Sequence, residues 1–364
     1  MTDTRLTIRA IRATAVEVPM RYVLGTSAAA VRAAPLLLVD VDTEEGITGR
    51  TYLFCYLRAA APAIVSLLGE IGHSVRGERI VPAVIWAQLS RRFRLIGVEG
   101  VVRMAMAACD AACWDALAIA ANLPLATYLG GTLKPIRAYN SCGLGLMPAA
   151  ALADEAEQLL AGGFTGVKLR LGYATVEEDL AALYAVKKRV PANISIMVDF
   201  NQALAADEAL ARCRALDGEG VYWIEEPIRH DDYAGSAMLA REIKTPIQIG
   251  ENFSEPRAMV RALDAGACDY VMPDLERIGG VTGWREAAAL AAARAMPMSS
   301  HLFPEVSTHL LAATPTAHWL EYVDWADSIL EEPLRIVDGN AEAPGRPGNG
   351  MAWNADAVKR YRLE

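Results

Sequence analysis

The sequence predicts an α/β protein in which an N-terminal α+β part precedes a closed barrel of parallel strands and helices. Two observations lead to this fold. After Pro135, eight short β-rich runs alternate with Ala-rich stretches of helix length, and such alternation is typical of a parallel sheet. Eight units are also the number that closes a (β/α)8 barrel. An open doubly wound sheet is the alternative, but the strands lack the Gly-rich first turn that would favour it.

The first part of the chain changes from β to α along its length. The alternating pattern at 6–19 and the apolar run at 35–41 predict strands. A Glu-Glu-Gly turn at 44–46 ends the second strand, and a further apolar run follows at 51–56. From 59 to 129, Ala, Leu and Met recur at helical spacing, and a Gly-Gly pair at 130–131 then interrupts the pattern. With a Pro/Gly-rich end that packs back on the body, we divide the chain into 1–132, 133–331 and 332–364.

The expected barrel strands share one chemical feature, because from the second onward each ends in a polar or ionisable residue. These residues recur every 20 to 31 positions, which is the length of a βα unit. A residue kept at one phase of that unit falls at the C-terminal face of a barrel, where active sites are built. The expected strands are 136–141, 166–171, 195–200, 221–227, 246–252, 269–275, 297–302 and 318–323. The residues in phase are Lys168, Asp199, Glu225, Glu251, Asp274, His301 and Glu321.

The composition excludes some classes of partner. Lys and Arg number 35 against 44 Asp and Glu, which gives a net charge of −9, so nucleic acid is not the expected partner. No apolar run reaches the roughly 18 residues of a membrane span, and the start has no apolar signal-peptide core. The six cysteines form no Cys-x-x-Cys pair, and reduced thiols fit a cytoplasmic location.

Asp199, Glu225 and Glu251 end three successive strands. Three acids that converge on one point repel one another unless a cation lies between them. Oxygen ligands without His or Cys favour Mg²⁺, with Mn²⁺ as a substitute, over zinc. Each acid alone also has a structural interpretation. Asp199 could cap a helix and Glu251 could pair with an arginine. Glu226, rather than Glu225, could face inward. The three acids at one phase favour a metal site.

Asp274 and His301 are expected on adjacent strands, where the carboxylate would fix the imidazole tautomer and raise its basicity. Lys168 and Arg170 are two residues apart on one strand, so their side chains share a face. Opposite the acids they could bind a substrate carboxylate; an exposed edge is the alternative. Glu321 could be a neutral acid that donates to a developing enolate oxygen, or a salt-bridge partner. A cation, a His–Asp pair and fixed positive charge suit removal of a proton next to a carboxylate.

Motifs along nearly the whole chain point to one family. They are VDFNQ (198–202), WIEEP (223–227), GEN (250–252), MPD (272–274), RIGGVTGW (277–284), PMSSHLF (297–303) and LLAATPTAHWLE (310–321). With them the sequence resembles the enolase superfamily, and within it the mandelate racemase subgroup. The resemblance implies a modified (β/α)7β barrel, an N-terminal capping domain that supplies specificity, and a homo-oligomer, an octamer by resemblance.

The same resemblance implies roles for individual residues. Asp199, Glu225 and Glu251 would be the metal ligands, and the His301–Asp274 pair would be the base. Lys168 and Glu321 would contact the carboxylate of a small-molecule substrate, with Glu321 as the electrophilic acid. Ser141 and Asn201 would line the site. The positions that match those around a substrate's aromatic ring are Leu24, Val31, Phe54, Tyr56 and Leu95, and Val323 would continue this apolar wall.

One position departs from the racemase pattern, in which the second residue of Lys-x-Lys is the base on the opposite face. Here it is Arg170, and a guanidinium stays protonated at neutral pH. A dehydratase of acid sugars, which needs only His301, is therefore an alternative. The apolar capping residues favour a racemase or epimerase of a 2-hydroxy acid with an apolar or aryl substituent, because sugar hydroxyls would lie unpaired against carbon. This is the preferred function. A metal-bound barrel without turnover is the third alternative.

Overall fold

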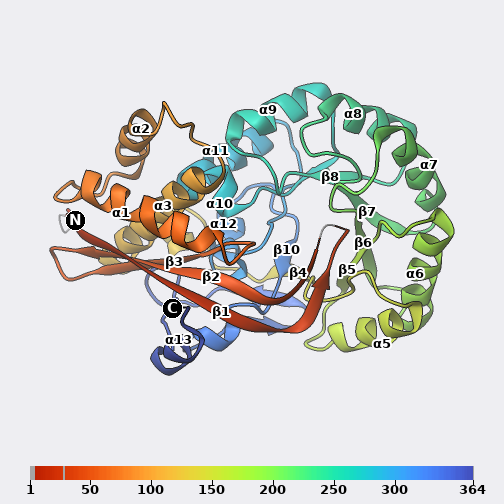
Figure 1. The fold of residues 1–364 in the computed structure, drawn as a ribbon, viewed down its shortest axis with the longest axis horizontal. Coiled ribbons are helices and arrows are strands. Elements are labelled where there is room, and N and C mark those ends of the chain that lie inside the picture. Colours follow the sequence, from red (N-terminus) through yellow and green to blue (C-terminus); the bar gives the residue numbers. More distant parts are fainter. Residues whose placement is uncertain (1–4, 28, 364) are drawn as a thin grey trace.

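The computed structural model describes residues 5–27 and 29–363. In Figure 1 a long antiparallel sheet with helices beside it adjoins a ring of strands that is surrounded by helices. The antiparallel sheet has the strand order β1-β2-β3. Its strands are β1 (Ile8–Gly25), β2 (Ala30–Thr43) and β3 (Thr48–Phe54), and the helices beside it are α1 (Ala60–Val75), α2 (Pro82–Arg92), α3 (Gly100–Ala120) and α4 (Leu125–Tyr128). The first part is therefore α+β, as expected, although β1 extends beyond the predicted strand.

Helix α3 lies directly against this sheet because the facing surfaces carry small side chains. A Cβ atom added to Gly49 of β3 would lie only 2.0 Å from the carbonyl oxygen of Ala112. Only glycine fits at such a close approach. Cys109 and Cys113 belong to the same Ala-rich helix, where both are buried and free. Their thiols are therefore small core side chains.

The second part is a sheet of parallel strands in the order β4-β5-β6-β7-β8-β9, and β10 pairs in parallel with β4 at the other end. Seven of the eight expected strands are present, and each is shorter than predicted. They are β4 (Ile136–Asn140), β5 (Gly166–Arg170), β6 (Ser195–Asp199), β7 (Val221–Glu225), β8 (Ile247–Ile249), β9 (Tyr270–Val271) and β10 (Leu320–Tyr322).

The expected strand at 297–302 is not a regular strand, and this part of the prediction is wrong. Met298 forms isolated parallel bridges to Val271 on one side and to Ala317 on the other. The segment thus lies between β9 and the chain that leads into β10, so single bridges close the ring. Leu302 and Phe303 both have φ of 49°, a left-handed conformation that ends extended pairing.

Helices follow the barrel strands and cover the outside of the ring (Figure 1). They are α5 (Ala149–Leu159), α6 (Val176–Arg189), α7 (Ala206–Leu216), α8 (Tyr233–Glu242), α9 (Pro256–Ala265), α10 (Leu275–Ile278), α11 (Gly280–Ala293) and α12 (Pro304–Ala312). In the described chain, β10 is followed by the 3-10 turn Asp327–Ile329, and no α-helix lies between β10 and the next strand. This order corresponds to the expected (β/α)7β pattern.

The C-terminal segment contacts both parts of the molecule. Strands β11 (Arg335–Val337) and β12 (Asn340–Glu342) extend the barrel sheet, because β12 pairs with β4. Helix α13 (Ala355–Tyr361) follows near the C-terminus. Beyond it the chain passes β1, where the Leu363 N–H donates to the Ala15 carbonyl. The division of the chain at residues 132 and 331 stays a prediction.

The interior of the barrel is closed below the polar residues by an aromatic cluster. Tyr139, Trp223 and Trp319 are fully buried together with Met197. Because bulky side chains fill this space, the functional groups at the strand ends face only the opposite, C-terminal face. Among the described residues, no helix is long and apolar enough to cross a membrane.

Candidate active site

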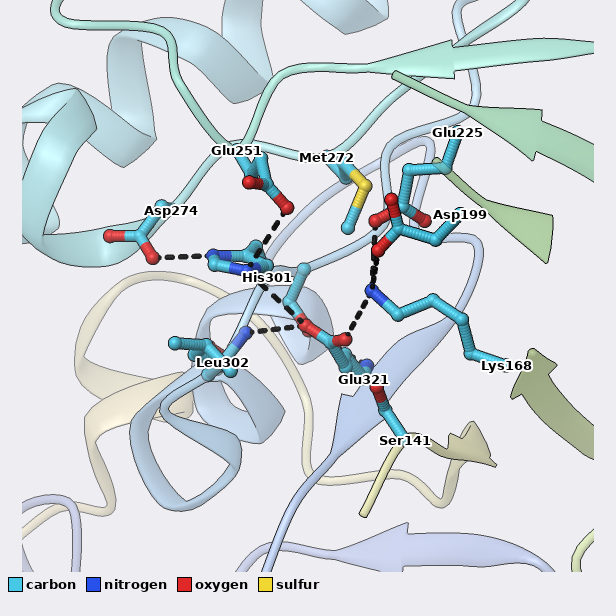
Figure 2. A network of polar contacts seen from close by, with 12 residues as sticks. Ser141, Lys168, Asp199, Glu225, Glu251, Met272, Asp274, His301, Leu302 and Glu321 are labelled. Carbon is cyan, nitrogen blue, oxygen red and sulfur yellow. Dashed lines mark hydrogen bonds and ion pairs between the residues drawn. The ribbon is translucent and has the colours of Figure 1, made fainter. Parts of the chain in front are cut away.

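The strand ends bring the seven phased residues to one place (Figure 2). Lys168 lies in β5, Asp199 and Glu225 end β6 and β7, and Glu251 follows β8. Asp274 caps α10, His301 lies in the bridged segment, and Glu321 lies in β10. Every one of these side chains is buried. The periodicity of the sequence therefore corresponds to one ring of groups in space.

Asp199, Glu225 and Glu251 form a compact cluster of acids. Each offers a carboxylate oxygen within 4.8 Å of the oxygens of the other two. Glu225, not its neighbour Glu226, faces this centre, because the Glu226 carboxylate accepts a hydrogen bond from Asn252 Nδ2 at 2.7 Å. Three carboxylates on rigid strand ends are the hard oxygen ligands that a divalent cation prefers.

The charges around this cluster also fit a cation. The Lys168 ammonium lies 3.1 Å from Asp199, 2.8 Å from Glu225 and 2.7 Å from Glu321. Burial lowers the pKa of Lys168, but these carboxylates outweigh burial and hold the pKa well above its usual range. One ammonium does not balance the surrounding acids, and burial with the neighbouring carboxylates raises the pKa of Glu225 to about 8, against the opposing effect of Lys168. A dication between the acids would remove this excess negative charge.

His301 is oriented by its neighbours. Its Nδ1 atom lies 2.6 Å from Asp274 Oδ2, and Nε2 lies 3.3 Å from Glu251 and 3.8 Å from Glu321. Burial lowers the pKa of this imidazole, but the carboxylates of Glu251, Glu321 and Asp274 outweigh burial and raise the pKa to about 9. Nε2 therefore points across the acid cluster and is the ring atom available for proton transfer (Figure 2).

Glu321 is placed as an ion-pair partner in this arrangement. It accepts a hydrogen bond from the Leu302 N–H at 2.9 Å and contacts Lys168. Burial raises the pKa of its carboxyl group, but Lys168 and His301 outweigh burial and lower the pKa to about 2. These contacts correspond to the salt-bridge interpretation of Glu321, and its role as an acid towards a substrate stays a prediction.

Arg170 shares the inward face of β5 with Lys168, but its partners differ. Its guanidinium donates to the Gly143 carbonyl at 2.6 Å and to the carbonyl and hydroxyl oxygens of Ser141 at 3.3 and 3.2 Å. Both Arg170 and Ser141 are buried. The guanidinium is therefore bound to a loop of the barrel, whereas the ammonium of Lys168 is bound to carboxylates.

A cavity of about 320 Å³ opens over these groups and is shared by both parts of the chain. Asn201 lies at its polar side, where its backbone and side-chain nitrogens donate to Asp199. Phe54 lies between Tyr56 and Trp325, with ring centroids 4.5 and 4.8 Å away, and forms an aromatic wall. The residues of the first part that line the cavity are Leu24, Thr26, Ala29, Val31, Phe54, Tyr56 and Leu57.

Two pocket predictions do not agree with the structure. Leu95 is 96% exposed in the turn after α2 and does not line the cavity. Its assignment depended only on matching positions. Val323 is buried and does not line the cavity, whereas Trp325, two residues further on, does. Sequence reasoning also missed Arg277, which lies over the Tyr56 ring at 4.5 Å, although it belongs to a quoted motif.

Comparison with known proteins agrees with this geometry. The model of the mandelate racemase / muconate lactonizing enzyme N-terminal domain matches residues 8–130, and that of the enolase C-terminal domain-like family matches residues 151–357. The chain belongs to the enolase superfamily. It falls in the mandelate racemase and muconate lactonizing subgroup, as the motifs indicated, and its relatives are enzymes.

Solved structures of this enolase superfamily resemble the whole chain. An enolase from alpha pretobacterium bal199 with bound Mg is 43% identical, covers 98% of this chain and 100% of its own, and has a TM-score of 0.96. An enolase from Bradyrhizobium, complexed with magnesium and mandelic acid, is 39% identical with full coverage of both chains and a TM-score of 0.95. Among curated relatives, the 3,6-anhydro-alpha-L-galactonate cycloisomerase of Streptomyces coelicolor is 31% identical over 90% of this chain and 91% of its own.

Proposed function

We propose that the protein catalyses Mg²⁺-dependent removal of the α-proton from a 2-hydroxy acid that carries an apolar or aryl substituent. The observation that carries the proposal is the arrangement of His301 Nε2 and the Asp199, Glu225 and Glu251 cluster on one cavity. A proton on a carbon next to a carboxylate is lost only if the enolate that forms is stabilised by positive charge. In this cavity the acid cluster that would hold the cation and the imidazole of His301 face the same space.

The acid cluster would hold the metal ion. Bound there, Mg²⁺ would supply positive charge for the carboxylate and for the developing enolate oxygen. Lys168 adds a fixed ammonium, and its three carboxylate partners keep it charged. Mn²⁺ has similar ligand preferences and is the expected substitute. Relatives crystallised with magnesium support this choice of metal.

His301 would take the α-proton on Nε2, because Nδ1 is occupied by Asp274. The aromatic wall of Phe54, Tyr56 and Trp325 would receive the apolar substituent. Return of a proton to the opposite face of the enolate would complete a racemisation or epimerisation. The mandelic acid bound by the Bradyrhizobium enolase is a 2-hydroxy acid with an aryl substituent and supports this substrate class.

Dehydration is the second candidate, and the contacts of Arg170 favour it. Racemisation needs proton exchange on both faces, but the Arg170 guanidinium is bound to loop carbonyls and stays protonated. With His301 alone, the enolate could instead lose a β-hydroxyl. The C–O bond breaks, His301 returns its proton to the leaving hydroxyl as water, and the enol becomes a 2-keto acid. Several curated relatives are sugar-acid dehydratases, among them arabinonate and D-gluconate dehydratase.

Exchange of the α-hydrogen with D₂O tests both candidates. Single enantiomers of 2-hydroxy acids and 2,3-dihydroxy acids are incubated with protein and Mg²⁺, beside the His301→Asn variant. Exchange with inversion supports the racemase, and 2-keto acid formation supports the dehydratase. Absence of exchange and product across the panel would reject the proposal and favour a metal-bound barrel without turnover. The completeness of the site argues against that third alternative.

We also propose that the protein is a cytoplasmic homo-oligomer. The family resemblance supports oligomerisation, as an octamer, and six buried free cysteines are compatible with a reducing compartment. Light scattering on the purified protein would give the mass of the particle. A monomeric mass at micromolar concentration would exclude the octamer.

A further inference from the structure

We propose that Arg170 is a positioning residue that sets the substrate specificity of the cavity by holding its roof. The roof hairpin is defined here as residues 24–27 and 29–31, at the junction of β1 and β2. It contributes Leu24, Thr26, Ala29 and Val31 to the lining. The inference depends on the proposed function only for the identity of the substrate, because the connection itself is a chain of contacts within the protein.

The first step of this chain joins Arg170 to the loop at residues 141–146. The guanidinium donates to the Gly143 carbonyl at 2.6 Å and to both oxygens of Ser141. The backbone N–H of Arg170 donates to the Leu144 carbonyl at 2.9 Å. One residue of β5 therefore binds three residues of the loop. Charged donors make such bonds stronger than neutral ones, and this site is buried from water.

The loop needs this support because its backbone is strained. Leu144 has φ of 52°, which a residue with a side chain rarely adopts without help from its surroundings. The Leu144 N–H donates to the Glu155 carboxylate. Arg170 and Glu155 thus hold both polar groups of the Leu144 backbone. Loss of either partner would allow the strained residue to relax.

The second step joins the loop to the roof hairpin through backbone alone. The Leu146 N–H donates to the Gly25 carbonyl at 2.9 Å. A Cβ atom on Gly145 would lie 2.5 Å from the Gly25 nitrogen and 2.8 Å from its Cα atom. The two glycines therefore allow the backbone of the loop to contact the backbone of the hairpin directly. Because this contact has no flexible side chain in it, a shift of the loop is passed on to Gly25 and to its neighbour Leu24.

Leu24 and Val31 form part of the apolar side of the cavity, so their position decides which substituent fits. The Arg170 side chain also borders the cavity, but its guanidinium is hydrogen-bonded to Ser141 and Gly143 of the loop. Arg170 would therefore act on the substrate through this roof, while His301 and the acid cluster do the chemistry. Its loss is therefore expected to weaken binding of acids with apolar substituents and to leave the proton transfer by His301 intact. Loss of a residue that itself moved a proton would instead slow the proton transfer and leave substrate binding intact.

The first test measures the roof without any substrate. Backbone hydrogen–deuterium exchange is followed over the hairpin in the wild type, Arg170→Met, Arg170→Lys and the control Arg189→Met, whose exposed side chain pairs with Glu157 on the barrel surface. We expect faster exchange at the hairpin in Arg170→Met, partial rescue in Arg170→Lys, and no change in the control. Unchanged protection in Arg170→Met would overturn the inference. This readout remains valid even if the proposed function is wrong.

The second test uses kinetics with the Mg²⁺-loaded protein and an acid that the exchange assay has identified as a substrate. In Arg170→Met we expect KM to rise about tenfold, as for loss of a geometry-fixing hydrogen bond, while kcat and its pH profile stay close to the wild type. A fall in kcat with unchanged KM would overturn the inference. Loss of deuterium exchange on one face only would also overturn it, because Arg170 would then take part in proton transfer.

A second variant keeps the inference testable if Arg170→Met fails to fold. Gly145→Ala adds a methyl group against Gly25 without touching Arg170 or any catalytic group. It should raise hairpin exchange and KM in the same way, because it interrupts the second step of the connection. An unchanged hairpin and unchanged KM in Gly145→Ala would show that the loop does not hold the roof.

Discussion

Asp274 holds the imidazole of His301 at 2.6 Å and is itself held by backbone donors. Its other carboxylate oxygen accepts hydrogen bonds from the N–H groups of Glu276 and Arg277 at 2.7 and 3.1 Å. The carboxylate is therefore fixed by the start of α10 before it contacts the ring. Because Nδ1 is committed to this contact, Nε2 is the ring atom that remains free to exchange a proton in the proposed reaction.

Replacing either member of this pair should slow the reaction to different degrees. His301→Asn removes the base and should lower kcat by about 10² to 10⁴-fold, the usual contribution of general base catalysis. Asp274→Asn keeps the ring but removes the acceptor that fixes its tautomer, so we expect a smaller loss. The rate of α-proton exchange in D₂O, followed in samples quenched at successive times, measures the loss in both variants. His73→Gln, at an exposed position in α1, is the control, and full exchange by His301→Asn would exclude His301 as the base.

Much of this site follows from the sequence because strand ends in a barrel meet at one face. The phase of Asp199, Glu225 and Glu251 predicted neighbours in space, and their oxygens lie within 4.8 Å. The segment that carries His301 was harder to predict. Its apolar pattern resembles a strand, but a two-residue left-handed turn and isolated bridges replace a regular ladder there. Residue pattern reports which face is buried, but not how many hydrogen bonds join neighbouring strands.

Removal of one acid should remove metal binding, and the neighbouring glutamates provide a matched pair of variants. Glu225→Gln takes one carboxylate charge from the cluster, so Mg²⁺ affinity should fall about 100-fold or more. Glu226→Gln changes a buried carboxylate that faces Asn252, so its effect should be far smaller. Titration calorimetry with Mg²⁺ alone gives both affinities. Equal losses would mean that Glu226, and not only Glu225, contacts the ion.

The aromatic wall should control substrate choice. Trp325→Ala removes a ring that packs on Phe54 at 4.8 Å and lines the cavity, so KM for an aryl 2-hydroxy acid should rise about tenfold. For an acid with a small alkyl substituent the change should be much smaller. Steady-state kinetics with both acids gives the comparison, with the half-exposed Tyr184→Ala on α6 as control. A similar loss for both acids would indicate a general disturbance and not a contact with the substituent.

Pocket residues could be predicted only in part, for a physical reason. Leu24, Val31, Phe54 and Tyr56 lie in the first part of the chain at the cavity, as the resemblance implied. Trp325 belongs to an irregular segment after β10, where no periodicity indicates which side chain faces inward. The role of Arg170 was hidden for a similar reason. Its spacing from Lys168 predicted the shared face, but its partners are backbone carbonyls of a loop, and residue identity does not specify loop conformation.

The contact between α3 and the barrel should make stability depend on pH. Asp110 of α3 is buried and accepts hydrogen bonds from the backbone and hydroxyl of Thr282 in α11. Burial raises the pKa of Asp110 to about 7, against the lowering effect of Thr282. The folded state therefore binds this proton more tightly than the unfolded chain, whose carboxyl titrates near pH 4, roughly. Its contribution to the unfolding free energy is full below that value and is lost as pH rises to about 7.

Asp110→Asn tests this dependence because an amide cannot ionise, yet its oxygen can accept from Thr282 N and its nitrogen can donate to the Thr282 hydroxyl. The free energy of unfolding, from urea denaturation at pH 5, 6, 7 and 8, should fall less steeply in the variant than in the wild type. The difference is about 1.4 kcal/mol for each unit by which the pKa is raised. Asp264→Asn, at an exposed position beside Arg294, should follow the wild-type curve. Parallel curves for Asp110→Asn and the wild type would mean that this carboxyl group is already ionised at pH 5 in the folded protein.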